Sequence, residues 1–352
     1  MAFTAEGGVE PKGERYDRSY LVKSDDKLYK RTEFNDFIYS SNNLDVGSIG
    51  LNKYGTAVIS DVYEIFRVKP DNSPTFMSEL IQRPHNIAEI LKYRQGCLYG
   101  QYRIYAEDFL NISVLVPTKP EQEKVSRFLD ALDLRIEHQA SLIKALKKYK
   151  RGLLNKVFSN INGNIYPTVY LSEVADFLQG LTYSPSDVSV SGYLVLRSSN
   201  IQNGVLSFDD CVYVDKKVDE SLQVKCDDVI MCVRNGSKKL VGKTALIPNN
   251  MAMTTWGAFM MIIRSKLNDT YIFHYLNSQM FFSQVFKDTG TATINQITKG
   301  ILNECKLPLP PETARKQISK MLSSFDVKIQ NAEMCLTTLV ELKKALLQQL
   351  FI

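Results

Sequence analysis

The chain has 352 residues, of which 44% are hydrophobic, with a mean hydropathy of -0.16 and a net charge of +5. This length favours two domains, because single hydrophobic cores stop growing at about 250–300 residues. No stretch approaches the roughly 20 consecutive apolar residues of a bilayer span, and the first residues lack the basic start and apolar core of a signal peptide. We therefore expect a cytoplasmic protein that does not bind membranes. The mildly positive charge permits a polyanionic partner without requiring one.

The cysteines and histidines do not form a metal-binding pattern. The six cysteines include no CxxC pair, and the three histidines, His85, His138 and His274, lie far apart in the sequence. We expect reduced thiols and no bound metal.

Residues 1–117 are expected to form a first mixed domain. The opening stretch MAFTAEGGVEPKGER has the composition of a loop, which makes the N-terminal part of this domain short or atypical. The apolar runs NDFIYSSNN (35–43) and VYEIFRV (62–68) predict strands, and MSELIQRPHNIAEILKYRQGC (77–97) predicts helix.

Residues 118–160 predict a long helical spacer. Its inner positions follow in steps of four and three, which is the pattern of a coiled-coil seam: Val125, Leu129, Leu132, Ile136, Gln139, Ile143, Leu146, Lys150, Leu153 and Val157. About 38 residues of helix span roughly 57 Å, or about 17 base pairs of DNA. Ten basic residues lie between 119 and 158 against five acidic ones, and most are expected on the solvated face. A kink that separates a short first helix from the long one is expected near Asp133 and near its counterpart in the second repeat, Asp326, because Asp favours helix caps.

Residues 161–310 predict a second mixed domain of strands and loops. Short runs rich in Val, Ile and Tyr alternate with Gly, Asn and Asp, as in GYLVLRSSNI, DDVIMCVRNGS and FMMIIRS. A helix is expected over 268–288, with an inner face formed by Ile272, Tyr275, Leu276, Met280, Val285 and Phe286. The single tryptophan, Trp256, is expected in the core or at a domain edge and not on a base-stacking surface.

Residues 311–352 repeat the first spacer. A shift of 193 residues aligns 114–158 with 307–351 without a gap. The identical pairs include Pro117/Pro310, Asp133/Asp326, Lys150/Lys343 and Phe158/Phe351, and the seam recurs at Ile318, Leu322, Phe325, Ile329, Ala332, Leu336, Leu339, Lys343, Leu346 and Leu350. The strand-like runs recur in the same order, with 35–43 matching 227–235 and 62–68 matching 259–265. The order is therefore domain, long helix, domain, long helix, and the two helices are expected to pack on each other.

Two proline-led stretches, VPTKPEQEKVSRFLDALDLRI and LPLPPETARKQISKMLSSFDVKI, each pass into a lysine-rich helix, and YPTVYLSEVADFLQG (166–180) opens the second domain. This tandem order resembles the specificity subunit of type I restriction-modification enzymes, from about residue 34 onward. The resemblance implies an α/β fold with two mixed α/β target-recognition domains, separated by two long helices that pack as an antiparallel coiled coil with a pseudo-twofold internal repeat.

The resemblance also implies a function. Each recognition domain would read one half of a bipartite site in double-stranded DNA, while the helical pair would fix the gap and dock two methyltransferase subunits. Restriction subunits would complete the complex. The chain itself would have no active site and no cofactor, and the partner subunits would bind S-adenosylmethionine, ATP and Mg2+. An alternative is a coiled-coil protein-interaction scaffold without sequence-specific DNA binding.

Polar turns supply the candidates for DNA contact, because phosphates and base edges are bound by basic, hydroxyl and amide side chains. In the second domain the candidates are Arg197, Ser198, Asn200, Arg234, Asn235, Ser237, Lys238, Lys239, Thr291, Thr293 and Asn295. The matching places in the first domain are Ser41, Asn42, Asn43, Lys53 and Arg103. For any one of them, an ordinary solvated loop explains the polar residue equally well.

Enzyme motifs are not found in complete form. The stretch GSKKLVGKT (236–244) has five residues between its glycines where a phosphate-binding loop has four, and it leads into TALIPNN instead of a helix. No glycine-rich cofactor loop of a methyltransferase and no Ser/His/Asp or Cys/His set is recognisable. The sequence therefore predicts a binding protein and not an enzyme.

Overall fold

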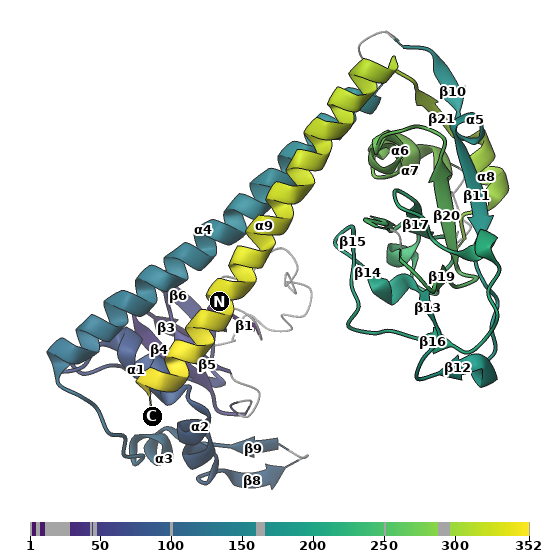
Figure 1. Ribbon diagram of the computed structural model, residues 1–352. Coiled ribbons are helices and arrows are strands. Elements are labelled where there is room, and N and C mark those ends of the chain that lie inside the picture. The colour runs from purple at the N-terminus through teal and green to yellow at the C-terminus, as the bar shows by residue number, and fades with distance from the viewer. Residues whose placement is uncertain are drawn as a thin grey trace. The chain divides into compact units, whose positions relative to one another are not determined.

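The computed structural model describes residues 2–4, 8–10, 29–42, 44, 48–98, 101–159, 166–249, 251–287 and 296–351. The chain divides into two compact units, with 1–140 and 334–352 in unit 1 and 141–333 in unit 2. Each unit contains a mixed α/β part and one segment of each of the long helices α4 (Lys119–Phe158) and α9 (Glu312–Leu350), which are labelled in Figure 1.

The two long helices pack against each other in opposite directions. In unit 2, Lys147 Nζ lies 2.6 Å from Glu333 Oε1, and one turn further along α4 Lys150 pairs with Asp326. Rising residue numbers in α4 therefore meet falling numbers in α9, and the predicted antiparallel coiled coil is confirmed.

The Lys150–Asp326 pair has a counterpart in unit 1, where Lys343 Nζ lies 2.5 Å from Asp133 Oδ1. The two lysines are 193 residues apart, and so are the two aspartates, so one interaction is formed twice by the internal repeat. A pair of repeats related by a twofold axis forms each cross-contact twice. The repeated ion pair therefore agrees with the predicted pseudo-twofold repeat.

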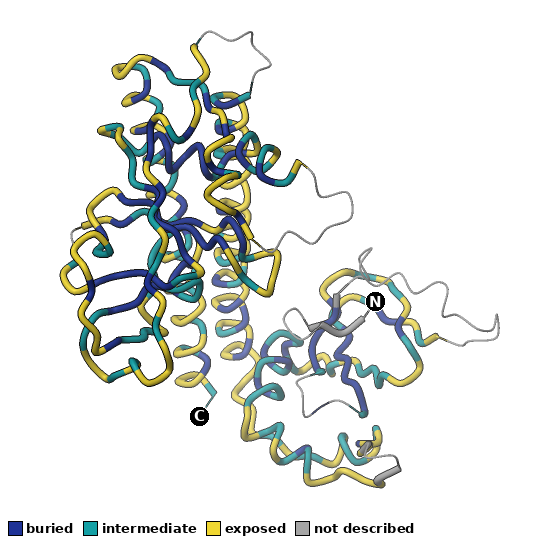
Figure 2. Tube along the Cα trace, turned by 90° about the vertical axis from the view of Figure 1, so that its right-hand side faces the viewer, coloured by how far each residue is buried: buried dark blue, intermediate teal, exposed yellow. Residues whose placement is uncertain are grey.

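The predicted seam is the inner stripe of both helices. Every seam position is buried or half-buried except Leu350, the last helical residue, and the alternation of buried and exposed residues along the helices is visible in Figure 2. The predicted kinks near Asp133 and Asp326 are wrong, because α4 and α9 each continue through the aspartate without interruption. Asp133 caps no helix end, and its carboxylate instead binds Lys343 on the neighbouring helix.

The α/β part of unit 2 is built on an antiparallel sheet of four strands in the order β11-β20-β17-β18. The strands are β11 (Ala175–Gln179), β20 (Met260–Ser265), β17 (Val229–Cys232) and β18 (Thr244–Leu246). Both faces of the sheet are covered, since Met231 and Ile263 belong to one core cluster, and Ile230 and Ile262 belong to another.

Helices cover one face of this sheet and a second sheet covers the other. The helices are α5 (Leu171–Val174), α6 (Tyr271–Leu276), α7 (Gln279–Val285) and α8 (Lys299–Glu304). The second sheet has the order β12-β16-β13-β19, with β12 (Val188–Ser189), β16 (Tyr213–Val214), β13 (Tyr193–Leu196) and β19 (Thr254–Trp256). Trp256 is fully buried between the sheets and donates its Nε1–H to the Leu178 carbonyl, which confirms its predicted place in the core.

Smaller elements complete unit 2. They are the strand pairs β10 (Thr168–Tyr170) with β21 (Lys306–Pro308) and β14 (Ile201–Gln202) with β15 (Val205–Leu206), and the 3-10 turns η5 (Pro185–Asp187), η6 (Ser198–Asn200), η7 (Glu220–Leu222) and η8 (Lys238–Leu240).

Helices α6 and α7 replace the single helix that was predicted over 268–288. Ser278 interrupts it, because its hydroxyl donates to the Tyr275 carbonyl at the end of α6 and accepts the Phe281 N–H at the start of α7. The predicted inner face is correct, since each of its residues is buried or half-buried in this part of the core.

Unit 1 is built on an antiparallel sheet of three strands in the order β5-β4-β7, with β5 (Ile49–Leu51), β4 (Asp36–Ser40) and β7 (Tyr63–Arg67). Further strand pairs are β3 (Tyr29–Thr32) with β6 (Ala57–Ser60), β8 (Gln95–Leu98) with β9 (Gln101–Arg103), and β1 (Ala2–Thr4) with β2 (Gly8–Glu10); the helices are α1 (Pro74–Ile81), α2 (Pro84–Leu91) and α3 (Ala106–Leu110). The loop predicted at the start of the chain is wrong for β1 and β2, while 5–7 and 11–28 lie outside the described residues.

Strands β4 and β17 begin with the same turn, which supports the repeat within the α/β parts. Asn35 has φ 67° and Asp227 has φ 65°, a left-handed conformation that Asn and Asp tolerate better than most residues. In each turn the next carboxylate, Asp36 or Asp228, accepts a backbone N–H three residues earlier, at 2.6 and 2.8 Å.

The same carboxylates bind an arginine on the neighbouring strand. Asp36 Oδ1 lies 3.3 Å from Arg67 Nε, and Asp228 Oδ2 lies 2.7 Å from Arg264 Nη2. Because β4 pairs with β7 as β17 pairs with β20, the matches predicted between 35–43 and 227–235 and between 62–68 and 259–265 are confirmed.

In unit 1 the first turn of α4 is tied to the α/β part by an amide. Gln122 donates from Nε2 to Asn72 Oδ1 and to the Pro117 carbonyl, each at 2.9 Å, and its Oε1 accepts the Ser73 N–H. The side chain is 1% exposed, so these bonds satisfy a polar group that water does not reach.

In unit 2 an ion pair takes the equivalent place. Arg315 lies 193 residues after Gln122, and its Nε is 2.6 Å from Asp269 Oδ2 while Nη1 donates to the Pro310 carbonyl. The two side chains are 9% and 5% exposed. The two units thus share one anchor, which is neutral in unit 1 and ionic in unit 2.

We predict that Arg315→Gln lowers the free energy of unfolding by about 3 kcal/mol, because it leaves the buried Asp269 carboxylate without its cation. The double variant Arg315→Gln/Asp269→Asn recreates the amide pair of unit 1 and should recover most of this loss. Denaturant unfolding measures both effects, and Lys316→Ala on the exposed next position is the control. A double variant no more stable than Arg315→Gln alone would contradict the equivalence of the two anchors.

His274 lies buried on α6 where α9 covers it. Its Nε2 is 3.1 Å from Ser323 Oγ, and its Nδ1 is 3.8 Å from Asp326 Oδ2, a carboxylate that already binds Lys150. Burial, reinforced by the charge of Lys150, lowers the pKa of His274 from 6.5 to about 3. The imidazole is therefore neutral in the folded chain at pH 7.

We predict that acid destabilises the wild type more than His274→Gln. Below pH 6.5 His274 is protonated in the unfolded chain, whereas in the folded chain it stays neutral down to about pH 3. The contribution of this group to the free energy of unfolding is therefore complete above pH 6.5 and decreases as the pH falls. At pH 5 the loss is about 2 kcal/mol relative to pH 8. Denaturant unfolding at both pH values measures it, and equal pH dependence in the two proteins would exclude this histidine as the cause.

Candidate nucleic-acid interface

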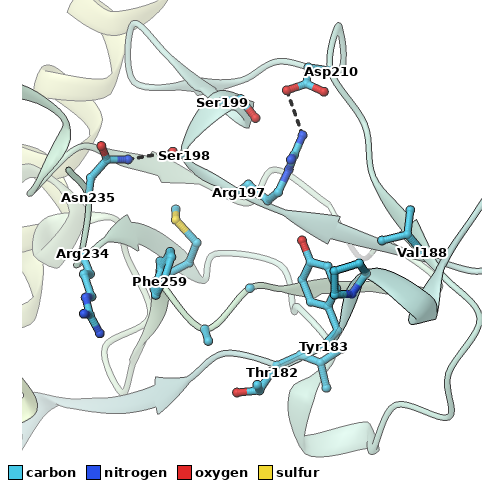
Figure 3. Close-up of a pocket in the computed structure, with 15 residues that line it drawn as sticks. Thr182, Tyr183, Val188, Arg197, Ser198, Ser199, Asp210, Arg234, Asn235 and Phe259 are labelled. Carbon is cyan, nitrogen blue, oxygen red and sulfur yellow. Dashed lines mark hydrogen bonds and ion pairs between the residues drawn. The ribbon is translucent and has the colours of Figure 1, made fainter. Parts of the chain in front are cut away.

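The loops that follow β11, β13, β17 and β19 line a cavity of about 710 Å³ in unit 2. Four predicted contact residues lie in its wall: Arg197, Ser198, Arg234 and Asn235. The other lining residues include Leu181, Thr182, Tyr183, Val188, Asp210 and Phe259, and Figure 3 shows these side chains around the cavity. Residues that are 37 positions apart in the sequence are thus brought together, as the 3.2 Å hydrogen bond from Asn235 Nδ2 to Ser198 Oγ shows.

A close contact between two backbones fixes one side of the cavity. A Cβ atom on Gly180 would lie 2.1 Å from the Gly257 carbonyl oxygen, so only glycine fits at this place. The next residue, Leu181, donates its N–H to the Trp256 carbonyl at 2.7 Å. The segment that carries Thr182 and Tyr183 is thereby attached to the buried end of β19.

Arg234 lies on an exposed phenylalanine. Its guanidinium carbon is 5.3 Å from the ring centroid of Phe259, whose side chain is 59% exposed, and its backbone N–H donates to the Phe259 carbonyl. No carboxylate among the described residues pairs with it. The sequence analysis missed Phe259, because the run FMMIIRS was interpreted as a buried strand, although the aromatic residue precedes β20.

Asn235 makes the turn after β17 rigid. Its Oδ1 accepts the Ser237 N–H at 2.9 Å while its Nδ2 binds Ser198. Ser237, Lys238 and Lys239 follow on exposed backbone at η8. These hydroxyl and ammonium groups can bind phosphate, and they extend the polar turn next to the cavity.

Arg197 and Asn200 have structural partners. Arg197 Nη2 lies 2.8 Å from Asp210 Oδ2, and its backbone N–H donates to Asn200 Oδ1. Asn200 is fully buried, and its Nδ2 donates to the carbonyls of Ser207 and Asp210, both at 3.0 Å. The predicted DNA contact is therefore wrong for Asn200, which instead holds the 207–210 loop from inside.

In unit 1 the predicted residues do not form one cluster. Ser41 is buried and donates to the Val62 carbonyl, so its role is structural and not a DNA contact. Lys53 Nζ lies 3.7 Å from Asp133 on α4, and Arg103 lies 3.6 Å from Glu64 and over the ring of Tyr105. Asn42 is half-buried at the position that matches Arg234.

Four predicted contact residues, Asn43, Thr291, Thr293 and Asn295, lie outside the described residues. The rejection of a phosphate-binding loop at 236–244 is confirmed, because strand β18 and not a helix follows Lys243. Within the described residues, no group of three or more His, Cys, Asp or Glu side chains is arranged to hold a metal ion. Among the described helices, none has both the length and the apolar composition that crossing a bilayer requires.

Comparison with known proteins shows which family the chain resembles. Residues 166–339 match the type I restriction modification DNA specificity domain. The chain is 26% identical over 188 residues to the StySPI specificity subunit of Salmonella potsdam, and 27% identical over 172 residues to the EcoKI specificity subunit of Escherichia coli K12. Residues 166–339 are thus similar to a type I restriction modification DNA specificity domain, and the chain is similar to type I restriction enzyme specificity subunits.

The matches cover 51% and 46% of this chain but 40% and 36% of the two relatives, so the chain spans about two fifths of their length. Its fold is similar to that of the type I restriction-modification system S subunit from M. genitalium, with a TM-score of 0.60 and 16% identity over 92% of this chain and 84% of the other. The matched domain begins before β10 and includes the cavity of unit 2.

We predict that Asn200→Ala lowers the free energy of unfolding by about 1–3 kcal/mol, because it removes a buried amide that donates to the Ser207 and Asp210 carbonyls. Gln202→Ala, two residues further on an exposed side chain, is the matched control and should change stability by less than about 0.5 kcal/mol. Chemical denaturation compares the two. Equal stability of both variants would show that Asn200 does not support the loop.

Proposed function

We propose that this chain is the non-catalytic DNA-specificity subunit of a type I restriction-modification complex. Unit 1 and unit 2 each read one half of a bipartite site in double-stranded DNA. The observation that carries this proposal is the duplicated architecture, in which equivalent turns, ion pairs and helix anchors support two α/β parts with different polar surfaces. A split site needs two readers that share one scaffold and differ in what they contact.

The polar turn of unit 2 supports the DNA-binding role. Arg234, Lys238 and Lys239 are exposed within six residues of one another, next to a cavity with aromatic walls. Cations at this density attract the phosphate backbone, while the arginine and the neighbouring amide have the donors that base edges accept.

The long helices support the proposed docking of two methyltransferase subunits. Exposed apolar side chains flank both copies of the Lys–Asp pair, with Leu134 and Leu342 next to Asp133–Lys343 in unit 1, and Tyr149 and Val327 next to Lys150–Asp326 in unit 2. These side chains are 47–58% exposed and are again related by the 193-residue shift. Two equivalent apolar surfaces fit two copies of one partner.

We assign the chemistry to the partners. Methyltransferase subunits would bind S-adenosylmethionine, and restriction subunits would use ATP and Mg2+ and join for cleavage, all in the cytoplasm. This chain would contribute sequence recognition and the spacing of the half-sites, without a cofactor of its own.

Mapping of methylated adenines in a host that carries the chain and its methyltransferase partner tests this function. We predict that the methylated adenines lie in a bipartite motif with a constant gap. Replacement of 166–310 by the matching region of another specificity subunit should change one half of this motif, because each unit reads its half-site independently. The other half and the gap should stay unchanged. A host without the chain is the control. Methylation without a motif would instead favour a coiled-coil scaffold with no sequence-specific DNA binding.

A further inference from the structure

We propose that Arg234 reads a guanine in the half-site of unit 2, and that Phe259 is the positioning residue that holds its guanidinium for this contact. This inference rests on the proposed function, and it names the base and the residue pair. It also limits this type of contact to one of the two units.

Arg234 is the arginine of this site that remains available. The other arginine in the cavity wall, Arg197, is paired with Asp210, so its charge is already neutralised. Arg234 is exposed and has an aromatic ring as its described side-chain contact. A guanidinium has two parallel N–H donors that match guanine O6 and N7 in the major groove, which no other base presents as a pair of acceptors.

The backbone of Arg234 is fixed before any ligand binds. Its N–H and that of Val233 both donate to the Phe259 carbonyl, at 3.2 and 3.0 Å, and Val233 accepts the Ile297 N–H at 2.7 Å. The following residue, Asn235, uses both ends of its amide within the protein. The turn therefore loses little conformational entropy on binding, and stacking on Phe259 restricts the side chain in the same way.

Phe259 lines the cavity together with Arg234. The ring is 59% exposed, while the next residue, Met260, is buried in the core between the sheets. A ring on this strand end gives the guanidinium a flat support on one side and leaves its edge open to a ligand, as the view in Figure 3 allows the reader to follow.

Unit 1 has different residues at the matching positions. The register of β4 with β7 pairs Ser40 with Tyr63, as the register of β17 with β20 pairs Cys232 with Met260. Asn42 lies two residues after Ser40 as Arg234 lies two residues after Cys232, and Val62, 43% exposed, precedes Tyr63 as Phe259 precedes Met260. Asn42 carries no charge and Val62 has no aromatic ring, so unit 1 does not read guanine through this pair of positions.

The test measures affinity of the complex with its methyltransferase partner for duplexes that carry the methylated motif. Each guanine is replaced singly by 7-deazaguanine, which lacks the N7 acceptor but keeps its base pairing. The wild type should lose affinity about ten-fold at one guanine of the unit 2 half-site. In Arg234→Ala this loss should disappear at that guanine alone, while the effects of 7-deazaguanine elsewhere persist.

Three further variants separate base reading from other roles. Lys238→Ala, on the same turn, should weaken binding to all duplexes and reduce the dependence on salt concentration, which is the behaviour of a phosphate contact. Phe259→Ala should reduce the discrimination against 7-deazaguanine, and Phe259→Tyr, which keeps the ring, should restore it. A purely structural role of Phe259 would instead lower affinity for every duplex equally.

The outcomes distinguish this inference from the proposed function. Absence of sequence-specific DNA binding by the wild-type complex would overturn both. Specific binding in which Arg234→Ala retains every 7-deazaguanine effect, or weakens all duplexes to the same degree, would overturn the guanine assignment and leave the proposed function intact. A unit 2 half-site without guanine on either strand would also overturn it.

Discussion

The packing of α4 against α9 is the constraint on which both units depend. Unit 1 is formed by two separate segments, 1–140 and 334–352, and unit 2 by the continuous segment 141–333, so each unit contains a part of α4 and a part of α9. In unit 1, Phe76 of α1 packs on Phe351 near the end of the chain, with ring centroids 5.0 Å apart. In unit 2, the equivalent Phe158 packs on Tyr271 of α6 at 5.1 Å. The phenylalanines at the ends of the two helical repeats, Phe158 and Phe351, therefore pack against the α/β parts of the two units.

The repeat preserves the supporting contacts and changes the exposed ones. The left-handed turn before β4 and β17 and the carboxylate that follows it occur in both units, and so does the arginine across the sheet. Immediately beyond the same strands the residues differ, with Asn42 in one unit and Arg234 in the other. This division lets surface residues vary without loss of the framework, since buried hydrogen-bonded groups are costly to replace and exposed ones are not.

The two units also differ in how they satisfy buried polar groups. Where Gln122 and Asn72 form a neutral amide pair, Arg315 and Asp269 form an ion pair that has a larger desolvation cost and larger mutual attraction. The cluster around His274 is likewise specific to unit 2, where burial keeps the imidazole neutral beside the Lys150–Asp326 pair. Acid and charge-removing substitutions should therefore affect unit 2 first.

The sequence by itself determined the order of domains and helices, the seam and the equivalence of the two repeats. These features depend on periodicity and local composition, which a linear pattern records directly. It also predicted that Trp256 is buried and that 236–244 is no phosphate-binding loop.

Only the tertiary structure decided which polar residues are buried and which are exposed. Asn200 and Arg234 look alike in sequence, as polar residues after apolar runs, yet Asn200 is enclosed by a loop that closes over it while Arg234 is exposed on a ring 25 residues further along the chain. The tertiary structure also decided that the helix continues through Asp133. The partner of this carboxylate is Lys343, 210 residues away in the sequence, and helix propensity does not take such a distant contact into account. Burial and long-range pairing arise from the folded arrangement of distant segments, and no local pattern encodes them.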